Sequence, residues 1–229
     1  MSRSRTDRDA ANAAYFDCWA DRYDEGRIGP WFRYTQDLAL DALDPRPESH
    51  VLDVGCGTGS AVLRLASLAP DIRVCGIDIS ARMIARARGK VPPAIADRVE
   101  FRRAAADAIP YADHTFDRLL CTNSFHHYPD PDRALGEMLR VLVPGGRLVI
   151  LENAPDLSWY TWAWDRLLRI TEKGHVRYYP SAELGALIRR AGFVGVELVH
   201  LANERFKHGK LFASIQLWRA RTRAIGATG

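Results

Sequence analysis

The sequence predicts one α/β domain, a parallel β-sheet with helices on both of its faces. Its 229 residues are 47% hydrophobic and 26% charged, a composition typical of a single globular domain. This composition excludes collagen, coiled coils and wholly disordered chains. Short apolar runs of strand length alternate along the chain with helical segments, and such alternation is typical of a parallel sheet covered by helices.

The predicted elements follow one another in a regular order. Two helices at 10–26 and 31–43 come first, and Asp44-Pro45-Arg46-Pro47 ends the second of them. Seven strands are expected at 50–54, 72–78, 99–103, 116–122, 147–152, 194–201 and 211–218. Five further helices are expected at 60–68, 81–88, 131–142, 157–170 and 181–191. No apolar run reaches the roughly 20 residues that a membrane-spanning helix needs.

The positive charge of the chain is concentrated at its two ends. A net charge of +4 and a pI near 9.0 would suit a nucleic-acid partner. However, residues 1–9 carry a net charge of +1 and residues 219–229 carry +3, so that residues 10–218 sum to zero. We therefore expect no basic groove on the folded body, and the composition does not favour nucleic acid as a partner.

The four cysteines form no recognisable metal or disulfide pattern. They are Cys18, Cys56, Cys75 and Cys121, with no CxxC and no Cys/His metal spacing among them. The first residues also lack the apolar core of a secretory signal. We therefore expect no metal site, reduced cysteines that serve as small packing residues, and a cytoplasmic protein.

The most informative motif is Val-Leu-Asp-Val-Gly-Cys-Gly-Thr-Gly at 51–59. An apolar strand leads into Gly55, Gly57 and Gly59 and then into a helix, so that a ligand can approach the backbone and meet unpaired N–H groups. Asp78 ends the next strand, where its carboxylate can accept hydrogen bonds from both hydroxyls of a ribose. The motif therefore predicts a cofactor that contains a nucleoside.

The spacing of these glycines separates two such cofactors. The dinucleotide fingerprint is G-x-G-x-x-G, and its third glycine position is occupied here by Ser60. The pattern is instead G-x-G-x-G, with Asp53 two residues before it. A carboxylate repels a pyrophosphate but attracts a cationic amino-acid group. The motif therefore favours S-adenosylmethionine over NAD.

With these motifs, the sequence resembles the class I S-adenosylmethionine-dependent methyltransferases, particularly the ubiquinone/menaquinone-biosynthesis-type small-molecule branch. The resemblance covers roughly residues 15–195 and includes segments 20–24, 51–59, 106–111, 116–127 and 139–148 in order. It implies a Rossmann-like, doubly wound, mostly parallel seven-stranded sheet with N-terminal helices and a helical lid after strand five. The expected divisions of the single domain 1–229 are helices at 10–43, a cofactor-binding core at 48–152, a lid and C-terminal part at 153–218, and a basic tail at 219–229.

The resemblance also implies roles for individual residues at the cofactor. Those expected near its methionine part are Asp53, Gly55, Cys56, Gly57, Thr58, Gly59 and Asn123, with Tyr23 reaching its carboxylate from the N-terminal helix. Those expected near its adenosine part are Asp78 at the ribose, Ile79 and Met83 on the adenine, and Asp107 at the adenine amine with Ala108 behind it.

Methyl transfer needs a base only where the acceptor atom carries a proton, and histidine titrates near working pH. The candidate catalytic residues are therefore His127, His126 and His175. If His126 and His127 lie in an extended loop they point in opposite directions, and at most one faces the substrate. The alternative for both is a structural hydrogen-bonding role. His175 follows the tryptophan-rich segment, where a lid could lie.

The segment 157–170 carries Trp159, Trp162 and Trp164 and has several interpretations. It could be a lid over the acceptor or a contact in a homodimer. It could be a core helix, because Leu157, Tyr160, Trp164, Leu167 and Leu168 follow helical spacing. It could also lie on a membrane surface as a peripheral contact, because tryptophan favours interfaces.

The leading hypothesis for function is transfer of a methyl group to oxygen, nitrogen or carbon of a small organic acceptor. One alternative is an RNA or protein methyltransferase, although the N-P-P-Y-like motif of amino-directed base methylation is replaced by Asn123-Ser124-Phe125-His126. Another is a catalytically silent S-adenosylmethionine-binding protein. The identity of the acceptor stays open.

Overall fold

The computed structural model describes residues 5–24, 29–172, 174–205, 212–224 and 226 of the chain. Its strands are β1 His50–Val54, β2 Arg73–Asp78, β3 Val99–Arg103, β4 Phe116–Thr122, β5 Leu142–Asn153, β6 Val194–Arg205 and β7 Phe212–Arg221. Its α-helices are α1 Arg5–Trp19, α2 Gly29–Leu43, α3 Ser60–Leu68, α4 Ala81–Gly89, α5 Pro131–Val141, α6 Trp159–Thr171 and α7 Ser181–Arg190. Two 3₁₀ turns, η1 Pro93–Ile95 and η2 Phe125–His127, complete the described elements.

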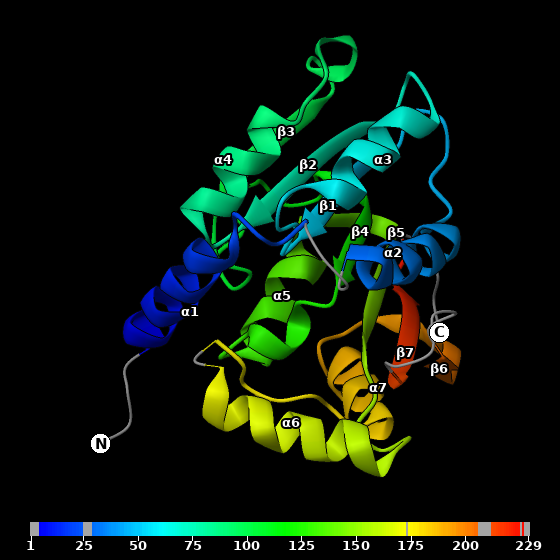
Figure 1. Cartoon of the computed structure of the whole chain (residues 1–229). Coiled ribbons are helices and arrows are strands. Elements are labelled where there is room, and N and C mark those ends of the chain that lie inside the picture. Colours follow the sequence, from blue (N-terminus) through cyan, green and yellow to red (C-terminus); the bar gives the residue numbers. More distant parts are fainter. Residues whose placement is uncertain (1–4, 25–28, 173, 206–211, 225, 227–229) are drawn as a thin grey trace.

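The predicted seven-stranded, mostly parallel sheet is confirmed (Figure 1). The strand order is β3-β2-β1-β4-β5-β7-β6. Strands β1 to β5 pair in parallel, whereas β7 runs antiparallel to both β5 and β6. The chain winds outward from β1 to β3 and then returns to place β4 on the other side of β1. The carboxyl ends of β1 and β4 therefore flank the switch point at which open α/β sheets bind ligands.

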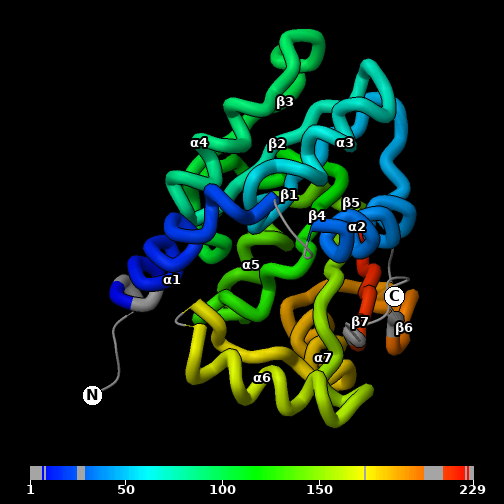
Figure 2. Tube along the Cα trace, viewed as in Figure 1, coloured from blue at the N-terminus to red at the C-terminus, as the bar shows by residue number. Residues whose placement is uncertain are grey.

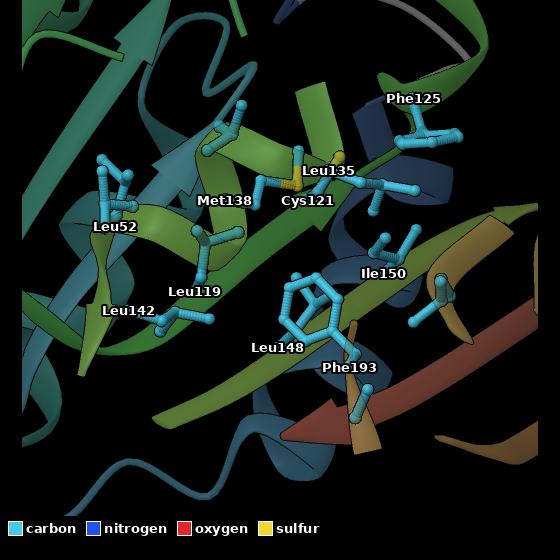
Figure 3. Close-up of a cluster of buried hydrophobic side chains, with 14 of the residues drawn as sticks. Leu52, Leu119, Cys121, Phe125, Leu135, Met138, Leu142, Leu148, Ile150 and Phe193 are labelled. Atoms are coloured by element: carbon cyan, nitrogen blue, oxygen red, sulfur yellow. The ribbon is translucent and has the colours of Figure 1, made fainter. Parts of the chain in front are cut away.

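Two apolar layers cover the two faces of the sheet. Leu52 and Val54 of β1 pack with the helices α5 and α7, and Figure 3 shows part of this cluster. Val51, on the opposite face, packs with α2 and α3. Each fully buried leucine contributes roughly 1.5–3 kcal/mol to folding. Because side chains alternate along a strand, Asp53 lies on the same face as Val51, next to α2.

The N-terminal helix ends earlier than the sequence predicts. α1 stops at Trp19, and the next residues form turns, so Tyr23 lies in a turn and not in a helix at 10–26. α1 lies beside α4, as the trace in Figure 2 shows. Asp17 accepts hydrogen bonds from the Ser80 hydroxyl (2.5 Å) and the Arg82 amide (3.0 Å). These bonds fix α1 against the start of α4, just after the carboxyl end of β2.

The C-terminal half departs from prediction at several element boundaries. β5 starts at Leu142 and not at 147, because Leu142 already pairs with Phe116 of β4, before an irregularity that precedes the pair Arg118 and Arg147. β7 continues to Arg221, so the expected tail at 219–229 begins too early. Arg219 pairs with Glu197 of β6 at 2.7 Å, which uses one of the charges assigned to that tail. Residues 225 and 227–229 of the expected tail lie outside the described residues.

Candidate functional site

The site lies where the parallel strands end and the glycine turn begins. The amides of Gly55 and Cys56 donate to the carbonyl of Ile77 in β2 at 2.8 and 2.9 Å, which holds the turn over the neighbouring strand. Gly55 has a φ of 77° and Gly57 a φ of 54°, both in the left-handed region. A Cβ at Gly55 would collide with the Ser124 side chain. Only glycine therefore fits this turn.

Gly59, predicted to line the cofactor, has a different task. It lies in neither of the two clefts described below. A Cβ at Gly59 would lie 2.5 Å from Phe101 of β3 and 3.0 Å from Ala87 of α4. The third glycine therefore allows the start of α3 to pack closely on its neighbours.

The carboxylate of Asp78 is held at the end of β2 by backbone amides. One oxygen accepts from Gly57 N at 2.9 Å and the other from Ser80 N at 2.8 Å. Burial raises the pKa of Asp78 to about 6, against the opposing effect of these hydrogen bonds. Each oxygen keeps a lone pair for a further donor such as a hydroxyl.

An open cleft of about 690 Å³ extends from Asp78 toward His127. Several of the predicted residues line it, namely Tyr23, Gly55, Gly57, Asp78, Ile79, Met83, Asp107, Asn123 and His127. Ala108 is exposed and outside this lining. α1 forms part of the wall, since Asn12 and Phe16 line the cleft and Asn12 donates to the carbonyl of His127 at 3.3 Å.

A second open cleft of about 940 Å³ lies on the α2 side of the glycine turn. It is lined by the predicted residues Asp53, Cys56 and Thr58, and it shares Tyr23, Gly55 and Asn123 with the first cleft. α2 contributes Arg33 and Gln36, which the sequence analysis missed. Tyr23 stacks on Phe32 of α2, with ring centroids 5.1 Å apart, between the two clefts.

Three buried oxygen acceptors line the second cleft without a hydrogen-bond partner among the described residues. They are Asp53 Oδ1, Gln36 Oε1 and Asn123 Oδ1. The orientation of Asn123 follows from its neighbour, since Thr35 Oγ1 already donates to the carbonyls of α2 and so accepts from Asn123 Nδ2 at 2.8 Å. Buried acceptors without donors are costly, and this set suits a ligand with several N–H donors.

The charge state of Asp53 is sensitive to such a ligand. Burial, with the nearby charge of Asp78, raises the pKa of Asp53 to about 7. A bound cation would favour the carboxylate form and lower that pKa. The carboxyl group of Asp53 is therefore expected to lose its proton when a cation enters the cleft.

The three candidate histidines come together at the opposite end of the first cleft. One ring nitrogen of each of His126, His127 and His175 lies within 4.8 Å of the others, and all three are buried. Nitrogens bound to one zinc ion would be about 3.3 Å apart, so this cluster would have to contract to hold a metal. Each ring is already anchored by a hydrogen bond.

The anchors of these rings differ and determine what each can do. His126 Nδ1 lies 2.7 Å from Glu152 and His175 Nε2 lies 2.8 Å from Asp165. His127 Nδ1 lies 2.8 Å from the carbonyl of Gly174 and must donate to it, which leaves the lone pair on Nε2. Burial lowers the pKa of His126 and of His127 well below the usual range. Both rings are therefore neutral.

The expectation that His126 and His127 point in opposite directions is wrong. Their segment is the 3₁₀ turn η2 and not an extended loop, and their ring centroids lie 3.9 Å apart. His127 alone of the three lines the first cleft. Glu152 was missed, although it lies near the end of a parallel strand as Asp53 and Asp78 do. That position was a signal that could have identified it.

The helix α6 is not the core helix that one interpretation suggests. Its buried residues are polar, Thr161 and Asp165, whereas Trp164 and Leu167 of the expected apolar stripe are 54% and 46% exposed. No described helix is long and apolar enough to cross a membrane.

Known proteins resemble part of this chain in sequence. Residues 52–150 match the family model of the methyltransferase domain. The demethylmenaquinone methyltransferase of Thermus thermophilus is 42% identical over 125 residues, which cover 55% of this chain and 54% of that protein. The 27-O-demethylrifamycin SV methyltransferase of Amycolatopsis mediterranei is 40% identical over 119 residues, covering 52% and 43%. The chain thus spans about half the length of the curated relatives it matches.

A solved structure extends the likeness of fold to most of the chain. It is an S-adenosylmethionine-dependent methyltransferase of Thermotoga maritima, described as a possible histamine N-methyltransferase. It superposes with a TM-score of 0.73 at 22% identity, covering 93% of this chain and all of the other. The chain therefore has the Rossmann-like fold of this methyltransferase structure, and its residues 52–150 resemble a methyltransferase domain in sequence.

Proposed function

We propose that this protein is an enzyme that transfers a methyl group from S-adenosylmethionine to a small organic acceptor. The observation that carries the proposal is the set of three unpartnered acceptors in the second cleft, one glycine turn away from Asp78. An α-ammonium group has three N–H donors and a positive charge, so Asp53, Gln36 and Asn123 match it in both number and sign.

Residues that line the two clefts would bind the remaining parts of the cofactor. Arg33 lines the second cleft and would pair with the methionine carboxylate. The free lone pairs of Asp78 would accept from the ribose hydroxyls. Ile79 and Met83 would contact the adenine, and Asp107 would accept from its amino group. Tyr23, which lines both clefts, would lie over the centre of the molecule.

When bound, this cofactor supplies a methyl group already activated by its sulfonium. The chain itself then has to align the acceptor, exclude water and accept a proton where the acceptor carries one. His127 is our proposed base, because its Nε2 lone pair is fixed by the Gly174 bond and its ring lines the first cleft. The Glu172 carboxylate, 4.0 Å from Nε2, would stabilise the imidazolium that forms. His126 and His175 would act as positioning residues.

The acceptor class is a small molecule, and its identity stays open. Two relatives of nearly equal identity carry names with chemically different acceptors, a menaquinone precursor and a rifamycin. Similarity in the shared domain therefore does not select the acceptor. We propose a cytoplasmic location, which the four free cysteine thiols support. The exposed apolar residues of α6 support either a homodimer or a peripheral membrane contact.

Calorimetric titration with S-adenosylmethionine tests the cofactor site. Asp78→Ala is expected to weaken binding roughly tenfold or more, because two charge-assisted hydrogen bonds to the ribose are lost. Asp97→Ala, which removes an exposed carboxylate before β3, is the matched control and should bind as the wild type does. Absence of binding by the wild type, or equal binding by Asp78→Ala, would overturn the assignment.

Turnover separates the enzyme from a silent binding protein. The measurement is formation of S-adenosylhomocysteine with a panel of phenols, quinols, amines and sugars. Methylation of at least one small acceptor is expected. Tight cofactor binding with no turnover on any of them would favour the silent binder, and turnover only on RNA or protein would favour the macromolecular alternative.

A further inference from the structure

The helix α6 is amphipathic in the reverse sense, with its polar side toward the protein. Thr161 and Asp165, one turn apart, are buried. On the opposite side, Trp159 is 80% exposed and Ile170 84% exposed. We define the α6 apolar face as Trp159, Trp162, Leu167 and Ile170. At 3.6 residues per turn these four side chains leave the helix within an arc of roughly 140°.

Hydrogen bonds fix the rotation of α6 about its axis. The Asp165 carboxylate accepts from His175 Nε2 at 2.8 Å, from the amide of Tyr178 at 2.6 Å and from Arg169 at 2.6 Å. Thr161 Oγ1 lies 2.9 Å from Ser214 Oγ of β7. Turning the tryptophans inward would break all of these bonds and leave buried polar atoms unpaired. The apolar face is therefore held outward.

A cation lies within this face and no exposed acid lies beside it on the helix. Arg166 is exposed, and its guanidinium lies 5.3 Å from the centre of the Trp162 ring. Asp165, the single acid of α6, is buried. Tryptophan and arginine together are typical of helices at a lipid–water interface, where the rings lie among the headgroups and the cation meets lipid phosphates.

The same charges disfavour a second copy of this chain as the occupant. A twofold interface brings identical surfaces together, so Arg166 would approach its own counterpart with no α6 carboxylate to pair with. Helix α6 has 13 residues, too few to cross a bilayer, and Figure 1 shows it along the outer edge of the fold. It could therefore lie flat in an interface without other elements in the way.

We propose that the α6 apolar face binds the surface of membranes that contain anionic lipids. The proposal deepens the proposed function, on which its consequence for the substrate rests. α6 ends at Thr171, three residues before Gly174, whose carbonyl holds His127 at the first cleft. Membrane binding would therefore bring the proposed base close to the headgroup layer, and it indicates an apolar acceptor that is taken from the bilayer.

Vesicle flotation tests the proposal with the full chain and no cofactor. Wild-type protein should float with phosphatidylcholine vesicles that contain about one third phosphatidylglycerol, and less with phosphatidylcholine alone. The double substitution Trp159→Ala with Ile170→Ala should lower the partition coefficient at least about tenfold. Arg166→Gln should weaken binding severalfold on anionic vesicles only. Trp19→Ala, at a 42% exposed tryptophan on α1, is the matched control and should bind normally.

Two results would overturn the membrane proposal. One is the absence of vesicle binding by the wild type, or equal binding by the double variant. The other is a wild-type dimer in light scattering that the double variant converts to a monomer without any vesicle binding. Cofactor titration of the double variant keeps the two proposals apart, because it should match the wild type whatever happens on vesicles. Failure to bind S-adenosylmethionine with intact vesicle binding would count against the proposed function alone.

Discussion

Two regions of the site differ in the direction in which burial shifts the pKa of their side chains. We call the carboxyl ends of β1 and β2 the floor and the turn η2 the wall. The floor carries the carboxyl groups of Asp53 and Asp78, fixed by strands β1 and β2, and burial raises the pKa of both. The wall carries His126 and His127, fixed by a 3₁₀ turn, and burial lowers the pKa of both. In each region burial favours the uncharged form. Near pH 7 the two imidazoles are therefore neutral, whereas Asp53 titrates in this range and Asp78 is mostly ionised.

The largest expected effect is a loss of turnover, without a loss of cofactor affinity, when His127 of the wall is replaced. His127→Ala should lower turnover by roughly 10²–10⁴-fold on an acceptor that carries a proton, because the base is lost. The dissociation constant of S-adenosylmethionine should stay within about twofold of wild type, since the partners we propose for it lie elsewhere. Steady-state kinetics and calorimetry measure the two quantities.

His200→Ala, on β6, is the control for this change and should leave turnover as it is. Equal turnover of His127→Ala and wild type would reject the base assignment. A loss of cofactor affinity as large as the loss of turnover would instead assign His127 to cofactor binding.

The next effect concerns Gly59, which packs the start of α3 against its neighbours below the cofactor site. Gly59→Ala should lower the free energy of unfolding by roughly 2–4 kcal/mol, because it adds a Cβ at a φ of 79° and against Phe101. Urea denaturation measures it. Gly136→Ala in α5, where a Cβ would meet nothing within 4 Å, should instead stabilise by about 0.5–1 kcal/mol. A neutral Gly59→Ala would show that this glycine is not a packing requirement.

A smaller effect tests the ionisation of the floor. Since the pKa of Asp53 is about 7 in the free protein and a cation favours the carboxylate, cofactor affinity should rise with pH. The rise between pH 6 and pH 8 should be about tenfold, with a proton released on binding below pH 7. Calorimetry in two buffers of different ionisation enthalpy measures both. Asp53→Asn should remove the pH dependence, and a persistent dependence in this variant would assign it to Asp78.

The smallest effect appears without cofactor. A carboxyl whose pKa is higher in the folded than in the unfolded state stabilises the fold at low pH, and this stability is lost as pH rises through the folded pKa. Asp53→Asn should therefore be more stable than wild type at pH 8, by on the order of 1 kcal/mol, and show a smaller difference at pH 5. Thermal unfolding at the two pH values measures it. A variant less stable than wild type at pH 8 would contradict this account.

The positions of Asp53 and Asp78 could be predicted from the sequence, whereas for His126 and His127 the residues could be predicted but not their conformation. Strand β1 and helix α3 lie within their predicted bounds, because apolar runs and glycines act locally, and Asp53 and Asp78 followed from them. Gln36 reaches the second cleft only because α2 packs against β4 and β5, a contact that no local pattern encodes. Likewise, η2 depends on Glu152, 27 residues after Phe125, accepting its amide hydrogen bond.

The core-helix interpretation, one of those left open for α6, is wrong for a further reason. Its apolar residues follow helical spacing, and the usual inference places such a stripe in the core. Here the buried side is chosen by Asp165 and its partners His175 and Tyr178, which come after the helix in sequence. The pattern of α6 therefore indicates a helix correctly but not which side faces the protein.

The carboxylate of Asp165 joins two parts of the molecule that sequence alone would separate. It ties the surface helix to the ring of His175, and the preceding residue, Gly174, holds His127 by its carbonyl. The helix that carries the exposed tryptophans is thus connected to the segment that holds the proposed proton acceptor by the hydrogen bond between Asp165 and His175. Contacts made on the outer side of α6 therefore lie two hydrogen bonds away from the imidazole of His127, with Asp165 between them.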